Sequence, residues 1–319
     1  MNNAPLGSLC IYQFLGIQPG PSLLVLGAVH GNETCGSIAI KKIQEEMENG
    51  TVSIKRGKLT MVPITNPLAF KNKRREGQRN LNRNFKIVPN PRDFEDHICN
   101  LLYPMLSAHD VLLDLHSFQS PGTPFAMIGP PNNNGDLEPF MRAQEEEAFA
   151  MSLGVHRFVE GWMEVYADGV NERRERDVNA KIGYGIGTAE AIRQLGGIAI
   201  TLECGQHDDM SAPQVAYKAI RRALHHLDLT PEMAPFEKQD STQVIKLYKV
   251  VDRLHLSDDF CGTWQSFDEV KQDQVIAYRA NGQPLLADED GWIVFPNPGA
   301  QVNQEWFYLA RESSRFGYN

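Results

Sequence analysis

Two histidines and two glutamates stand where apolar runs of the sequence end. His30 and Glu33 follow the run LLVLGAV, His116 ends the run VLLDLH, and Glu203 ends the run IAITLE. Imidazole nitrogens and an ionised carboxylate suit zinc, and a His₂Glu set is a known catalytic zinc arrangement. We therefore predict that His30, Glu33 and His116 bind one zinc ion per chain.

Other side chains near these four could support the same chemistry. Glu203 would act first as general base and then as general acid, taking a proton from water and giving it to the leaving group. Asp114 lies two residues before His116, on the same side of a pleated strand, and would orient that ligand. Cys35 and Cys204 flank the proposed site, but the commoner role for such cysteines is that of small buried hydrophobes.

Each of these residues also has a purely structural interpretation. A single histidine at a strand end is more often a hydrogen-bonded structural residue than a metal ligand, and the HxxE pattern alone is a weak signal. Four matched residues at three strand ends favour the metal site. The other histidines have no comparable context, and we expect them on the surface or in the core.

Short runs rich in Val, Ile and Leu alternate with amphipathic segments over the first 230 residues. The predicted strands are 23–29, 58–65, 111–116, 125–128 and 198–204, and the predicted helices are 37–47, 94–106, 137–153 and 213–227. Continuous apolar strands between helices are typical of a mostly parallel sheet covered on both faces. We therefore predict an α/β fold. The carboxyl ends of its strands share one edge, where ligands bind, so the four residues can meet there.

The character of the sequence changes near Leu229. Residues 229–242 are rich in proline, acidic and small polar residues, which indicates a linker. Beyond it, VIKLYKVV, QVIAYRA and GWIVF are typical of short strands, separated by turn signals such as Asn281-Gly282. We predict a catalytic domain over residues 1–230 and a smaller all-β domain over residues 241–319 that restricts access to the site.

A basic segment, 66–85, follows the predicted strand 58–65 and so begins at the same sheet edge. Its six basic residues are Lys71, Lys73, Arg74, Arg75, Arg79 and Arg83. A solvated surface loop is one interpretation and a nucleic-acid site another, but the net charge of −9 disfavours the second. Arginines beside a metal would instead stabilise a developing oxyanion or bind a substrate carboxylate.

The composition places the chain among ordinary globular proteins, with 42% hydrophobic and 22% charged residues. The five cysteines are scattered and contain no CxxC pair, which is typical of reduced thiols. We see no signal peptide, and the apolar runs are too short to cross a membrane. We expect a cytoplasmic protein without nucleic-acid or membrane partners, and a homodimer, the commonest closed assembly.

The ordered motifs HGNE, NP followed by an arginine and LNR, DLH, and TLE resemble those of the succinylglutamate desuccinylase and aspartoacylase family. The members of this family are zinc-dependent amidohydrolases related in fold to the zinc carboxypeptidases. The resemblance covers roughly residues 20–230. The stretch PLLADEDGWIVFPNP is also similar, less specifically, to the second domain of the family.

The resemblance implies a role for each matched residue. His30, Glu33 and His116 match the zinc ligands, and Glu203 matches the general base and acid. Arg75 stands at the spacing of the arginine that polarises the scissile carbonyl. The pair within LNR, Asn82 and Arg83, matches the residues that hold the substrate carboxylate.

The family cleaves N-acyl amino acids at the amide bond, so we predict zinc-dependent hydrolysis of a small anionic N-acyl amino acid. The sequence CGQHDD after Glu203 fits neither named activity firmly. The loop Gly169–Gly185 could bind a carboxylate of the acyl group or be an ordinary charged surface loop. Alternative functions are carboxypeptidase-like cleavage of a peptide or cell-wall peptide fragment, and metal binding without catalysis.

Overall fold

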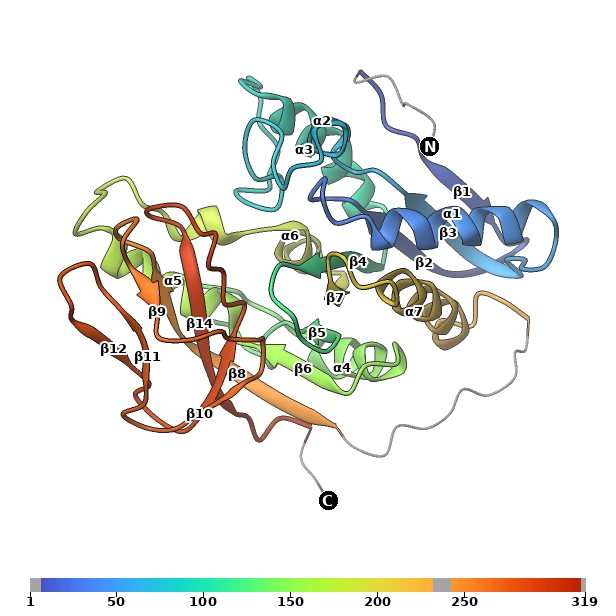
Figure 1. Cartoon of the computed structure of the whole chain (residues 1–319). Coiled ribbons are helices and arrows are strands. Elements are labelled where there is room, and N and C mark those ends of the chain that lie inside the picture. Colours follow the sequence, from blue (N-terminus) through green and yellow to red (C-terminus); the bar gives the residue numbers. More distant parts are fainter. Residues whose placement is uncertain (1–6, 232–241, 317–319) are drawn as a thin grey trace.

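The computed structural model describes residues 7–231 and 242–316, and within them one mixed sheet of eleven strands runs through the molecule (Figure 1). In spatial order its strands are β1 (Tyr12–Leu15), β3 (Arg56–Val62), β2 (Gln18–Gly27), β4 (Val111–Phe118), β7 (Ile198–Gln206), β5 (Phe125–Met127), β6 (Arg157–Glu160), β8 (Gln243–Asp252), β14 (Glu305–Glu312), β13 (Gly291–Val294) and β10 (Glu269–Val270). A second sheet contains β12 (Pro284–Leu286), β11 (Val275–Tyr278) and β9 (Asp259–Phe260).

Helices cover both faces of the sheet. They are α1 (Cys35–Glu48), α2 (Pro67–Asn72), α3 (Phe94–Ser107), α4 (Ala143–Ser152), α5 (Trp162–Arg173), α6 (Thr188–Gln194) and α7 (Ala212–His226), together with the 3₁₀ helix η1 (Ile182–Gly185). Leu23 and Val25 of β2 pack in one core with α1, α4 and α7, whereas Leu24 and Leu26 pack in another with α3 and α6. Both faces of β2 are thus buried, which explains its continuous apolar run.

The predicted α/β class is confirmed. The strands β3, β2, β4 and β7 are parallel neighbours, so their carboxyl ends share one edge. The sheet is mixed because β1 and β5 pair antiparallel with β3 and β7. The predicted helix 137–153 is wrong at its start, since α4 begins at Ala143. Asn133 and Phe140 exchange two backbone hydrogen bonds, which hold the chain before α4 outside the helix.

The C-terminal β region, residues 242–316, extends the same sheet. Strand β8 pairs in parallel with β6, and β14, β13 and β10 follow antiparallel. Figure 1 shows these strands, in orange and red, at the opposite end of the sheet from the blue N-terminal strands. The predicted linker 229–242 lies mostly outside the described residues, and the division into two domains stays a prediction.

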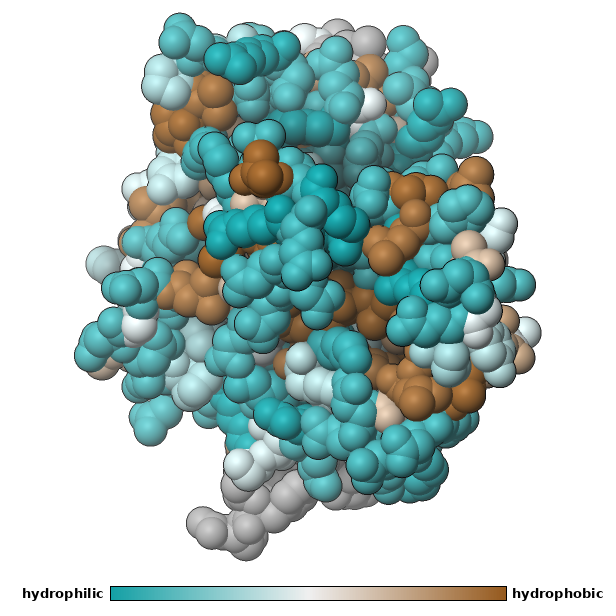
Figure 2. All heavy atoms as spheres, turned by 90° about the vertical axis from the view of Figure 1, so that its left-hand side faces the viewer, coloured by the Kyte–Doolittle hydropathy of each residue, from teal (hydrophilic) through white to brown (hydrophobic). Residues whose placement is uncertain are grey.

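The surface beside the C-terminal β region is mainly hydrophilic. Figure 2 shows this side of the molecule, where hydrophobic residues lie in separate patches among hydrophilic ones. The large apolar side chains of β8 and β14, such as Ile245 and Phe307, are instead buried in two further cores. In the part of the chain that the structure describes, no helix has the length and apolar character needed to cross a membrane.

A buried ionic cluster ties α6 and α4 to the sheet. Arg193 of α6 donates to Glu146 of α4 at 2.8 Å and to Glu138 at 3.0 Å, and it lies 3.5 Å from Glu190. The Glu146 carboxylate also accepts from the backbone N–H of Ala199 in β7. Three carboxylates thus depend on one guanidinium, and the loss of the cation would leave buried charge uncompensated.

We expect Arg193→Met to lower the free energy of unfolding by about 3–5 kcal/mol, because breaking a buried ion pair leaves its partner charges unpaired. Denaturant-induced unfolding would measure the change. Lys271→Ala is the matched control, since the exposed pair of Lys271 with Asp290 is screened by solvent and contributes little to stability. Equal losses in the two variants would contradict a stabilising role for the buried cluster.

The same cluster predicts how pH affects stability. Burial raises the pKa of Glu138 from 4.5 to about 7, against the opposing effect of Arg193. Between these values the folded protein holds a proton that the unfolded chain has released, so Glu138 lowers stability progressively as pH rises from 4.5 to 7. Glu138→Gln should therefore become more stable relative to the wild type across this range. Parallel unfolding free energies from pH 4.5 to 7.5 would contradict the assignment.

Candidate functional site

The loop after β2 brings His30 and Glu33 to the shared edge of the parallel strands. It is held by hydrogen bonds from Thr65 N–H to the carbonyl of Gly27 and from Asn66 N–H to the carbonyl of Ala28. A Cβ atom on Gly31 would lie only 2.0 Å from the backbone carbon of Ala69, so glycine is needed where this loop packs against α2. The tight packing fixes both potential ligands.

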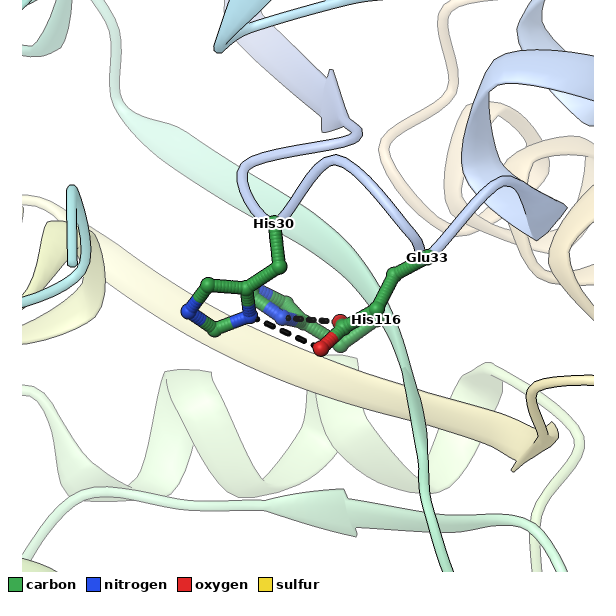
Figure 3. Close-up of side chains that lie close together, drawn as sticks. All are labelled: His30, Glu33 and His116. Carbon is green, nitrogen blue, oxygen red and sulfur yellow. Dashed lines mark hydrogen bonds and ion pairs between the residues drawn. The ribbon is translucent and has the colours of Figure 1, made fainter. Parts of the chain in front are cut away.

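The two histidines converge on the carboxylate of Glu33 (Figure 3). His30 Nδ1 lies 2.8 Å from Glu33 Oε1, and His116 Nδ1 lies 2.8 Å from Glu33 Oε2. All three residues are at most 2% exposed. Their potential ligand atoms lie within 4.8 Å of one another, so the structure brings together the three predicted zinc ligands.

The outer nitrogen of each imidazole faces an oxygen atom. Asn80 Oδ1 lies 3.0 Å from His30 Nε2, and Asp114 Oδ2 lies 3.1 Å from His116 Nε2. The hydroxyl of Thr188 donates to the same Asp114 oxygen. A hydrogen bond to the outer nitrogen can fix the tautomer and orientation of a metal-binding histidine, as Asn80 does for His30. Asp114 lies close to His116 Nε2 but does not meet the geometry of a hydrogen bond to it, so its predicted orienting role stays a prediction.

The ionisation of the three potential ligands follows from burial and from their mutual charges. Burial and Arg75 lower the pKa of His30 to about 4, which keeps this imidazole neutral. Burial opposes the ionisation of Glu33, but His30 and His116 hold its pKa well below the usual value. Burial also opposes a charge on His116, yet Asp114 and Glu33 raise its pKa. The carboxylates near the two imidazoles carry negative charge that a divalent cation would balance. Two imidazole nitrogens and one carboxylate are also ligands that zinc commonly has, so this set of residues fits zinc.

Glu203 stands beside this cluster on the neighbouring strand. It pairs directly with His116 in the register of β4 and β7. Its Oε2 atom is buried and has no hydrogen-bond partner among the described residues. Burial raises the pKa of Glu203 to about 8, although His116 lowers it in part. A buried carboxyl group with a free oxygen is well placed for proton transfer.

The basic segment 66–85 divides into structural and cavity-lining residues. Arg79 forms ion pairs with Asp93 and Asp96, so it holds the loop against α3. Arg75 donates to Glu33 Oε1 at 2.8 Å while its side chain remains 47% exposed. Of the six basic residues, Arg75 and Arg83 line the cavity at the site.

Asn82 and Arg83 lie next to each other in the cavity wall. The Asn82 side-chain oxygen accepts from the backbone N–H of Thr188, at the start of α6. The guanidinium of Arg83 lies 4.8 Å from the ring centroid of Trp162, and it donates to the backbone carbonyl of Asn82. The contact with the ring orients the planar guanidinium, whose charge also interacts with the Glu305 carboxylate.

The cavity at the site has a volume of about 870 Å³ and draws its walls from both parts of the chain. Phe295, Glu305 and Tyr308 of the C-terminal β region line it together with the proposed ligands His30 and His116. This volume lies within the range of small-molecule sites.

The predicted loop Gly169–Gly185 contains the end of α5 and all of η1. Arg173 and Arg176 from this segment form ion pairs with Asp252 of β8, and Arg173 also lies 3.3 Å from Glu305. Tyr184 lines the cavity. The two arginines therefore have carboxylate partners within the protein.

Some site residues were not predicted from the sequence. His207 was expected on the surface or in the core, but it lines the cavity, as do Asn32, Asn80 and Ser117. Ser117 directly follows a predicted ligand and Asn32 directly precedes another, and this adjacency was the available signal. Cys35 and Cys204 lie in the core, and burial raises the pKa of the Cys204 thiol, which argues against thiolate chemistry there.

Known proteins share both the sequence pattern and the fold. A model of the succinylglutamate desuccinylase/aspartoacylase catalytic domain matches residues 19–227. No curated protein matches the chain in sequence.

Solved structures similar to the chain include a succinylglutamate desuccinylase/aspartoacylase from Rhodobacter sphaeroides, with a TM-score of 0.73 and 18% identity over 96% of this chain and 89% of that one. The product-bound ectoine utilization protein EutE (DoeB) from Ruegeria pomeroyi has a TM-score of 0.71 and 18% identity, over 94% and 88%. Succinylglutamate desuccinylase from Vibrio cholerae has a TM-score of 0.69 and 18% identity, over 95% and 85%. These likenesses show a shared fold.

We expect the purified protein to bind about one zinc ion per chain and His116→Ala to lose it, because two remaining ligands hold zinc weakly. Elemental analysis after dialysis would measure the metal content. His97→Ala is the matched control, since His97 is exposed on α3. A wild-type protein that takes up no zinc after incubation with the metal would contradict the site.

Proposed function

Because the chain belongs to the succinylglutamate desuccinylase/aspartoacylase family, we propose that it is a zinc-dependent amidohydrolase acting on a small anionic N-acyl amino acid. The observation that carries this proposal is the buried set His30, Glu33 and His116, with Glu203 paired across the sheet from His116. The three proposed ligands could bind zinc without Glu203, so binding the metal does not require this residue. A carboxyl group poised for proton transfer beside the ligands supports catalysis rather than mere metal binding.

In the proposed reaction His30, Glu33 and His116 hold zinc, which supplies Lewis acidity and lowers the pKa of water when bound. The Glu203 carboxylate accepts a proton from the attacking water and donates it to the leaving amine nitrogen. Burial raises the pKa of Glu203, and the charge of zinc held by these ligands would favour the ionised form that a base requires.

Two arginines take different tasks in this proposal. Arg75 is the exposed one and already reaches the ligand cluster through Glu33, so it can polarise the scissile carbonyl and stabilise the developing oxyanion. Arg83 and Asn82 lie in the cavity wall beside Trp162 and bind the substrate carboxylate.

The cavity walls favour a small substrate over a peptide. Residues of the C-terminal β region, among them Phe295 and Tyr308, line the same cavity as the proposed zinc ligands. A wall of this kind restricts the space for a long chain. The similar structures carry the names of a desuccinylase and of an ectoine utilization protein, so the fold leaves the acyl group and the amino acid open.

We expect the zinc-loaded protein to hydrolyse N-acyl amino acids, and its rate to fall as the substrate is lengthened into a peptide. Glu203→Gln should lower kcat by about 10²–10⁴-fold, because it removes the proton acceptor. Amine release from a panel of N-acyl amino acids and peptides would measure both effects.

Zinc content provides the control for this variant. Glu203→Gln should bind zinc like the wild type, because Glu203 is not among the proposed ligands. Near-normal turnover by the variant would contradict the role of Glu203. Faster cleavage of longer peptides would favour the carboxypeptidase-like alternative.

A further inference from the structure

Three polar residues without a role in the proposed reaction form a hydrogen-bonded chain beside the ligands. Asn32 lies on the loop after β2, Ser117 in β4 and His207 on the loop after β7. His207 Nδ1 lies 2.9 Å from Ser117 Oγ, and His207 Nε2 lies 3.3 Å from Asn32 Nδ2. His207 thereby connects the three strand ends from which the proposed ligands and Glu203 come.

The directions of these hydrogen bonds define the state of His207. The Asn32 amide donates to Nε2, so the neutral imidazole carries its proton on Nδ1 and donates it to Ser117 Oγ. Burial lowers the pKa of His207, which favours this neutral form. Protonation would remove the acceptor that Asn32 requires.

An irregularity in β7 precedes His207, whose side chain reaches Ser117 of the neighbouring strand. Between the pairs His116–Glu203 and Phe118–Gln206, β7 has one more residue than β4. Gly205, within this extra length, has a φ of 130°, which side-chain-bearing residues rarely adopt. The backbone N–H of His207 then donates to the carbonyl of Phe118 at 2.9 Å. Bulges of this kind redirect a side chain near a functional site.

Both partners of His207 adjoin proposed ligands. Asn32 directly precedes Glu33, and Ser117 directly follows His116. The backbone N–H of Ser117 also donates to Glu33 Oε2 at 3.2 Å. A shift of either partner would therefore move a ligand or remove a hydrogen bond from the Glu33 carboxylate.

We propose that His207 is a positioning residue for the metal site, holding the Glu33 loop and the end of β4 in the geometry that binds zinc. The inference rests on the proposed function only in that His30, Glu33 and His116 are the zinc ligands. His207 is not among the proposed ligands, and it acts through Asn32 and Ser117. Groups that orient ligands in this way typically change metal affinity by about 10–100-fold.

The test is the zinc affinity of the full-length protein, measured by competition with a chelator. His207→Ala should bind zinc about 10–100-fold more weakly than the wild type. His207→Gln should recover most of the loss, because its side-chain amide offers one acceptor to Asn32 and one donor to Ser117. His97→Ala, exposed on α3, should bind zinc like the wild type.

Two further measurements separate positioning from a general effect on folding. Thermal unfolding of the metal-free proteins should change little in His207→Ala, whereas a purely structural role would lower the unfolding temperature and leave zinc affinity intact. The double variant with Ser117→Ala should lose no more affinity than His207→Ala alone, because both changes break one chain of contacts.

Unchanged zinc affinity in His207→Ala would overturn the inference, and so would equal losses in the alanine and glutamine variants. A wild-type protein that binds zinc but hydrolyses no amide would end the proposed function, while the affinity order of the variants would still support the positioning role. A wild-type protein that binds no zinc would overturn both.

Discussion

The site depends on a carboxylate that the fold buries and must compensate. Glu33 is 1% exposed, and an isolated charge at such a position would be strongly destabilising. Its Oε1 atom is approached by His30 and Arg75, and its Oε2 atom by His116 and the backbone N–H of Ser117. Because each oxygen has two partners, the rotamer of Glu33 and the orientation of both imidazoles are fixed together.

The sheet provides the precision that this arrangement requires. The parallel register places Gly27 beside Leu115 and His116 beside Glu203, so the ends of β2, β4 and β7 are aligned. Side chains alternate between the faces of a strand, and a slip of one residue would exchange them. Alternate side chains of β4 and β7 pack into two separate cores, and a slip would force side chains of the wrong size into each of them. Packing far from the site thus maintains its geometry.

The sequence was most informative where one local property determines the structure. Fully buried parallel strands give continuous apolar runs, so the strands and the polar residues at their ends, His30, Glu33, His116 and Glu203, could be predicted. The helix start at Ala143 could not, because it depends on a bridge between Asn133 and Phe140. The contact of Asn80 with His30 joins residues 50 positions apart, and that of His207 with Asn32 spans 175 positions. Neither contact leaves a periodic signal.

The charges around the cavity show why the C-terminal β region matters to the site. From the sequence, the loop Gly169–Gly185 could bind a substrate carboxylate or be an ordinary charged surface loop. In the structure its Arg173 donates to both carboxylate oxygens of Asp252 in β8. Glu305 of β14 adds a second carboxylate near it. Burial opposes the charge of Arg83, yet Glu305 raises its pKa, so the two guanidinium groups share this carboxylate. Arg83 itself donates to a backbone carbonyl and faces an aromatic ring. The C-terminal strands thus supply carboxylates to the arginines at the cavity as well as part of its wall.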